Sequence, residues 1–186
     1  MLRRLFGLPN RSNRLVVDAL YGEIVAAARQ PLLYSEWQVP DTPLGRYEMM
    51  ALHLFLLLHR LRAEQGAARD VAQELTDEFF KEVEHSIREL GIGDMGVPKR
   101  MKKLARMFYG RVGAYDAALD ADDATALAAA LTRNIRPDTD AWPQAQSLAA
   151  YVFAARDALA GQPAEGFVAG RLAFPSADRA PHGEAA

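Results

Sequence analysis

The strongest constraint on the fold of this chain is a stripe of apolar residues that recurs with helical spacing between residues 98 and 119. Its members follow one another at intervals of three, four, four, three and four positions: Met101, Leu104, Phe108, Val112, Tyr115 and Leu119. At about 100° per residue these side chains share one narrow face of an α-helix, and Lys99, Lys103 and Arg106 point away from that face. The stripe therefore predicts an amphipathic helix that packs on a helical core.

Five further segments have helical periodicity, and no strand pattern competes with them. They are residues 13–29, 43–64, 67–90, 122–134 and 140–160. Residues 43–64 are apolar on nearly every face, which is typical of a central helix. Asp41 or Thr42 is a suitable N-cap for this helix, with Pro43 in the first turn.

The segments together predict an all-α, single-domain helical bundle of about six helices with a hydrophobic central helix. We expect the bundle to span residues 13–175, with residues 31–42 irregular. Residues 1–12 are expected to form a flexible cationic N-terminus, or a weak foot on a membrane surface, and residues 176–186 a disordered tail.

The composition excludes several classes of site. The chain has 186 residues and no cysteine, which excludes disulfides, thiolate metal sites and cysteine nucleophiles. Its formal net charge is −2, so no general attraction to nucleic acid or acidic membranes is expected and any electrostatic function must be local. The longest apolar run, Met49 to Leu58, is shorter than the roughly 20 residues that cross a bilayer, and no signal peptide pattern is present.

The two histidines of the apolar helix do not form a metal-ligand pair. His53 and His59 are six positions apart, whereas ligands on one helix need a spacing of three or four to share a face. We therefore expect no metal site and no cofactor, and interpret both as packed histidines. A helical enzyme that uses Glu48, His53 and His59 is the alternative, and it predicts a polar cavity that joins the three side chains.

Two further patterns are better explained by structure than by chemistry. The glycines at positions 91, 93 and 96 have the spacing of a dinucleotide fingerprint, but they follow a helix where that fingerprint requires a strand. Asp120, Asp122 and Asp123 precede an alanine-rich helix and are expected to cap it. We predict that the protein is not an enzyme and has no small-molecule substrate.

A cluster of cations begins the helix at residues 98–119. Lys99, Arg100, Lys102 and Lys103 follow the glycine-rich turn directly, although cations are unfavourable at a helix N-terminus. One interpretation is that Glu84 and Glu89, near the end of the preceding helix, neutralise them. The other is that the surplus charge binds phosphate from RNA or lipid, or an acidic partner.

Several of these motifs together resemble the ubiquinol–cytochrome c chaperone family. The resemblance rests on Asp41-Thr42-Pro43-Leu44-Gly45-Arg46-Tyr47-Glu48-Met49, His53 to Leu61, Leu75-Thr76-Asp77 with Phe79-Phe80, Gly91-Ile92-Gly93-Asp94, Val97-Pro98-Lys99-Arg100-Met101-Lys102 and Phe108-Tyr109-Gly110-Arg111. It covers roughly residues 12–175. It implies an assembly chaperone for the cytochrome bc1 complex that binds newly made cytochrome b or another bc1 subunit.

This role implies two surfaces and a location. For docking to a ribosome or an anionic membrane surface we predict Asp94, Lys99, Arg100, Lys102, Lys103 and Arg111. For an apolar client groove we predict Phe79, Phe80, Met95, Tyr109 and Tyr115. The short N-terminus and alanine-rich composition indicate a bacterial member in the cytoplasm, with peripheral attachment to the inner membrane as an alternative. The competing function is a ribosome- or RNA-associated adaptor that uses the basic residues at 99–111.

Overall fold

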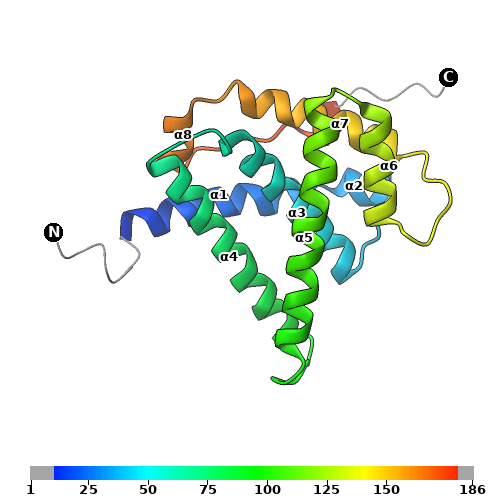
Figure 1. The fold of residues 1–186 in the computed structure, drawn as a ribbon, viewed down its shortest axis with the longest axis horizontal. Helices are drawn as coiled ribbons and strands as arrows, with labels where there is room; N and C mark the ends of the chain where they lie inside the picture. Colours follow the sequence, from blue (N-terminus) through cyan, green and yellow to red (C-terminus); the bar gives the residue numbers. More distant parts are fainter. Residues whose placement is uncertain (1–10, 180–186) are drawn as a thin grey trace.

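The computed structural model describes residues 11–179, and over this range the chain is helical without strands. Its elements are α1 (Arg11–Ala28), α2 (Pro31–Ser35), α3 (Pro43–Leu61), α4 (Ala67–Glu89), α5 (Val97–Asp120), α6 (Ala124–Ile135), α7 (Ala145–Ala160), α8 (Ala164–Val168) and a 3-10 turn, η1 (Ala177–Arg179) (Figure 1). The predicted all-α class is confirmed. The six long helices correspond to the six predicted segments, and none of the described helices has the length and apolar character needed to cross a membrane.

Helix α3 is the centre of the bundle, as its sequence predicts. It packs against α1, α4, α5, α6 and α7, and every residue from Ala51 to Leu57 is buried. Thr42 caps the helix, since its hydroxyl oxygen accepts a hydrogen bond of 3.1 Å from the backbone N–H of Gly45. Gly45 is required here because a Cβ atom would lie 1.9 Å from the carbonyl oxygen of Pro40. The entry into the central helix is therefore fixed by a cap and a close backbone approach.

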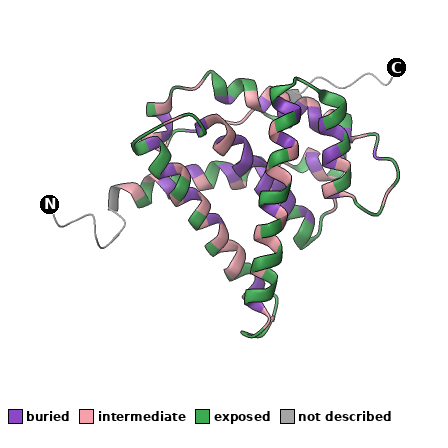
Figure 2. Cartoon of the chain, in the orientation of Figure 1, coloured by how far each residue is buried: buried purple, intermediate pink, exposed green. Residues whose placement is uncertain are grey.

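Helices α4 and α5 form a hairpin whose turn lies at the far end of the molecule, beyond the other helices (Figure 1). Gly91 begins the turn with a φ of 76°, a left-handed conformation that glycine adopts easily. The apolar stripe of α5 is buried at Phe108, Tyr115 and Leu119, but Met101 and Leu104, nearer the turn, are only partly buried. The tip is mostly exposed (Figure 2) because fewer helices cover it.

The segments outside the six long helices differ in part from expectation. Residues 31–42 contain the short helix α2, which begins with Pro31. The chain remains ordered past Ser176: Ala177 is buried, and its N–H donates a 2.6 Å hydrogen bond to the side-chain oxygen of Gln30. Of the predicted N-terminal segment 1–12, residues 11 and 12 belong to α1, whereas residues 1–10 and the remaining tail at 180–186 lie outside the described residues.

Candidate functional site: an apolar groove beside a cationic tip

An apolar groove of about 830 Å³ lies where α1, the start of α3, the second half of α4 and the start of α5 meet. Its apolar walls include Tyr21, Val25, Tyr34, Leu44, Met50, Val83, Ile87, Leu90, Ile92 and Leu104. Two of these leucines are unusually open, since Leu44 is 49% exposed and Leu90 is 60% exposed. The described part of the protein therefore presents a concave apolar surface in addition to its closed core.

The groove forms because the apolar stripe of α4 extends further than the helices that cover it. Phe79 is fully buried against Tyr47 and Phe108, with ring centroids 5.7 Å away in both cases. One turn later, Val83 is only partly buried and borders the groove. The periodicity that builds the core thus continues along the wall of the groove, where Ile87 is buried again.

The rim of the groove is polar. The phenol groups of Tyr21 and Tyr34, which line the groove, are held in the neutral form. Asp41 and Arg46 form an ion pair of 2.6 Å on one side, and Arg29, Glu82 and Arg100 border other parts of the opening. Burial, with Glu82 and Glu78 nearby, raises the pKa of Tyr21 to about 12. Burial also raises the pKa of Tyr34, whose hydroxyl donates a 2.7 Å hydrogen bond to the carbonyl of Ala28. The groove is therefore suited to an apolar ligand with polar ends.

The structure does not bring the five predicted groove residues together. Phe79 and Tyr115 are buried in the core, so they hold helices together in this conformation, and of the five only Phe79 borders the groove. Phe80 is partly buried beside Tyr109, which borders a second depression near the end of α3. Met95 is 99% exposed at the hairpin tip. Helical periodicity identified apolar residues correctly, but it does not reveal which of them another helix covers.

The cations at the start of α5 remain available at the surface. Lys99, Arg100, Lys102, Lys103 and Arg106 are exposed, and the ion pairs formed within residues 11–179 include none of them.

The two acids that were expected to neutralise these cations are bound to basic residues of α4 itself. Glu84 pairs with Arg88 at 2.9 Å, and Glu89 lies 3.2 Å from His85. Asp94, predicted as a docking residue, also pairs with Arg88. The interpretation in which Glu84 and Glu89 neutralise the cations of α5 is therefore not what the structure shows.

Arg111, predicted as a docking residue, is instead a buried link between α5 and α3. Its guanidinium donates a 2.6 Å hydrogen bond to Glu48, and a longer one of 3.4 Å to the carbonyl of Asn134. Both side chains of the pair are almost inaccessible, with 12% and 2% exposure. Burial raises the pKa of Glu48 to about 7, although the positive charge of Arg111 acts in the opposite direction. Arg111 therefore belongs to the interior and not to a contact surface.

The polar cavity expected for a helical enzyme is not formed around Glu48, His53 and His59. His53 is fully buried; its Nδ1–H donates to the carbonyl of Met49 at 2.7 Å and its Nε2 accepts from the Tyr151 hydroxyl at 2.8 Å. Burial lowers the pKa of His53 to about 4, so the ring is neutral. His59 is hydrogen-bonded to Asp116 at 2.7 Å, and the cavity of about 10 Å³ beside Glu48 is lined by neither histidine.

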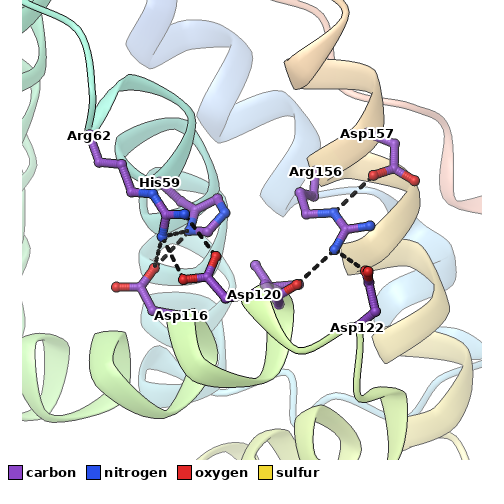
Figure 3. A network of polar contacts seen from close by, with 8 residues as sticks. His59, Arg62, Asp116, Asp120, Asp122, Arg156 and Asp157 are labelled. Carbon is purple, nitrogen blue, oxygen red and sulfur yellow. Dashed lines mark hydrogen bonds and ion pairs between the residues drawn. The ribbon is translucent and has the colours of Figure 1, made fainter.

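A different charged cluster lies at the end of α5 (Figure 3). Arg62 binds both carboxylate oxygens of Asp120, at 2.7 and 3.1 Å. Arg156 donates to the carbonyl of Leu119 at 2.8 Å and to Asp122 at 2.5 Å. Of the three aspartates predicted to cap α6, Asp123 does so: its side chain accepts a hydrogen bond from the N–H of Ala126 at 2.8 Å. Asp120 and Asp122, also predicted as caps, bind arginines instead.

Comparisons with known proteins agree with this architecture. The family model described as Ubiquinol-cytochrome C chaperone matches residues 35–174. A solved structure described as the Cbp3 homolog from Brucella abortus is 59% identical, with a TM-score of 0.87 over 97% of this chain and 99% of that chain.

A curated relative is more distant. Ubiquinol-cytochrome-c reductase complex assembly factor 1 of Xenopus laevis is 26% identical over 102 residues, which are 55% of this chain. The chain spans about half the length of this relative. Because the family model covers most of the chain and the solved homolog matches nearly all of it, this protein belongs to the ubiquinol–cytochrome c chaperone family.

Proposed function

We propose that the protein is a non-catalytic assembly chaperone of the cytochrome bc1 complex that binds newly made cytochrome b. The observation that carries this proposal is the apolar groove between α1, α3, α4 and α5. A membrane-protein client has apolar helices that need cover before insertion, and an apolar helix laid in a groove is a common mode of recognition. The Xenopus relative is named as an assembly factor of the ubiquinol-cytochrome-c reductase complex, which supports the assembly role.

The groove offers contacts suited to such a segment. Leu44 of α3 and Leu90 at the end of α4 provide open apolar side chains, and Met50 adds an adaptable side chain to the lining. Arg46 and Arg100 border the opening, where they can meet the polar residues that flank an apolar helix. This arrangement favours a binding protein over an enzyme.

The proposal is tested in a strain that assembles the bc1 complex. Deletion of the gene is expected to lower the haem b spectrum and bc1 activity while the cytochrome b transcript remains constant. Complementation with Leu44→Asp is expected to fail, because it places a charge in the groove. The fold tolerates this change, since an acid in the first turn of α3 interacts favourably with the helix dipole.

Leu15→Asp is the matched control. Leu15 is an exposed leucine on α1 that does not border the groove, so this variant is expected to restore activity. An unchanged haem b spectrum after deletion would refute the function. Equal complementation by both variants would refute the groove as the client site.

A ribosome- or RNA-associated adaptor is the second candidate, and the unpaired cations of α5 favour it. This function predicts co-sedimentation with ribosomes that weakens steeply with salt and persists in a strain without cytochrome b. If the protein no longer co-sediments with ribosomes in the strain without cytochrome b, this result would argue against the adaptor function.

A further inference from the structure

We propose that the tip of the α4–α5 hairpin is a membrane-contact site that inserts Met95 into the interface of an anionic bilayer. Leu90 is expected to lie beside it, and the cations at the start of α5 bind lipid phosphates. This inference goes beyond the function proposed above and does not depend on which client the groove binds.

The first observation is the exposure of apolar side chains where the molecule projects furthest. Met95 is 99% exposed, and Leu90 in the same turn is 60% exposed. The turn lies at the narrow end of the hairpin, away from the other helices (Figure 1), and its surface is mostly exposed (Figure 2). A projecting turn of this kind can reach the interface of a flat bilayer before any other part of the described chain.

The second observation is the charge that surrounds these apolar residues. Lys99, Arg100, Lys102 and Lys103 follow the turn within the first two turns of α5, and no ion pair in the described range satisfies them. Helix stability does not explain them, since cations are unfavourable at this end of a helix. Near an anionic leaflet each such cation strengthens binding by about fivefold.

The surroundings of the tip favour a bilayer over RNA. A nucleic acid strand that followed α5 would pass along α4, whose exposed and partly exposed faces carry Asp77, Glu78, Glu82 and Glu84. A flat bilayer touches the tip, where Asp94 is paired with Arg88 and Glu89 lies 3.2 Å from His85, and it avoids the acids further along α4. Met95 and Leu90 also offer no aromatic surface on which bases could stack.

The site is continuous with the groove. Leu90, Ile92 and Arg100 belong to the tip region and also border the groove. If the function proposed above is correct, contact with the bilayer places the end of the groove next to the membrane that a client helix enters. This consequence, unlike the membrane contact itself, rests on the proposed function.

The experiment uses the purified full chain without any client, so its outcome is separate from the test of chaperone function. Because the chain has no cysteine, Met95→Cys introduces a single site for an environment-sensitive NBD label. Ala129→Cys, on the exposed side of α6, is the matched control. With phosphatidylglycerol-containing vesicles we expect a blue shift and a stronger emission at position 95, and neither at position 129 or with phosphatidylcholine vesicles.

Charge reversal tests the electrostatic half of the site. Lys99→Glu, Lys102→Glu and Lys103→Glu together are expected to weaken vesicle binding on the order of a hundredfold, while the melting temperature changes little. Reversal of Arg69, Arg133 and Arg171, which are exposed elsewhere, gives the same change in net charge and is expected to retain most binding. Met95→Ser is expected to weaken binding about tenfold.

Three outcomes would overturn the proposal. One is an unchanged NBD spectrum at position 95 with anionic vesicles. Another is equal loss of binding in the tip and control triple variants, which would show a response to net charge alone. Binding to homopolymeric RNA without binding to vesicles would overturn it as well, and would assign the cations to the adaptor function.

Discussion

Both ends of α5 carry charged residues, but they use them in opposite ways. At the end of the helix, Asp116 and Asp120 face Arg62, while Asp122 and the carbonyl of Leu119 are bound by Arg156 (Figure 3). At the start, Lys99, Lys102 and Lys103 take part in none of the ion pairs found between residues 11 and 179. One end is neutralised internally, and the other presents its charge to solvent.

The difference shows that charge density alone does not identify a binding surface. The end of α5 lies against α3 and α7, so carboxylates and guanidiniums from different helices meet there. The start of α5 lies beside the end of α4, where Glu84 pairs with Arg88 and Glu89 lies close to His85. Arg111 lies at the boundary between the exposed charges and the internally paired charges of α5. By sequence it belongs to the cationic run, but in the fold it is paired with Glu48.

The largest expected effect on stability is at Arg111, the boundary between the exposed and the paired charges of α5. Arg111→Met is expected to lower the free energy of unfolding by about 3 kcal/mol, because it leaves Glu48 buried without a partner. Arg106→Met, on the exposed side of the same helix, is the control and is expected to change stability by less than about 0.5 kcal/mol. Urea unfolding of both variants measures the contrast. Similar losses of stability in the two variants would mean that Arg111 is no more tightly bound in the interior than the exposed Arg106.

The pH dependence of stability tests the buried pair of Arg111 and Glu48 in a second way. Burial raises the pKa of Glu48 from its ordinary value to about 7, so the folded state retains a proton that the unfolded state loses at lower pH. The contribution of Glu48 to stability is therefore fully present below about pH 4.5 and is lost as the pH rises toward 7. Glu48→Gln removes this dependence.

The stability of Glu48→Gln relative to the parent is consequently expected to rise by on the order of 3 kcal/mol between pH 4.5 and 7. Urea unfolding of both proteins across this range measures it. A difference in stability that stays constant between pH 4.5 and 7 would show that Arg111 keeps the Glu48 carboxylate ionised over this whole range.

A smaller loss is expected at the neutralised end. Arg156→Met removes the hydrogen bonds to Leu119, Asp122 and Asp157 and the guanidinium that lies 4.8 Å from the Phe153 ring centroid, so we expect a loss of about 1–2 kcal/mol. Arg133→Met, at an exposed arginine on α6, is the comparison and is expected to have almost no effect. A loss in both variants would remove the distinction between paired and unpaired arginines.

The smallest effect has the opposite sign. Lys99→Glu places an acid in the first turn of α5 and is expected to raise the free energy of unfolding by about 0.5 kcal/mol, through the helix dipole. Lys99→Gln should give roughly half of this gain. Thermal unfolding at low salt measures both. A destabilised Lys99→Glu would indicate that the native lysine is bound to an internal acid, which would remove the basis of the membrane-contact site.

Local sequence patterns were sufficient to predict the helices. The spacing from Met101 to Leu119 predicted α5, the continuous apolar run predicted the central position of α3, and Thr42 with Pro43 predicted how α3 begins. These features depend on residues within one or two turns of each other, so periodicity and capping are enough to reveal them. The exposed cations at positions 99 to 103 were likewise visible from their place opposite the apolar stripe.

The partners of each residue were decided by tertiary structure alone. Arg111 meets Glu48 across 63 positions of sequence, and Arg62 meets Asp120 across 58. The groove arises where the apolar stripe of α4 continues past the helices that cover Phe79, and nothing within α4 marks that point. The sequence by itself determined which face of each long helix is apolar and where α3, α4 and α5 begin, because both are local properties. Only the packing of the helices decided which apolar residues stay open and which charges are neutralised, because these depend on the neighbours that the fold brings together.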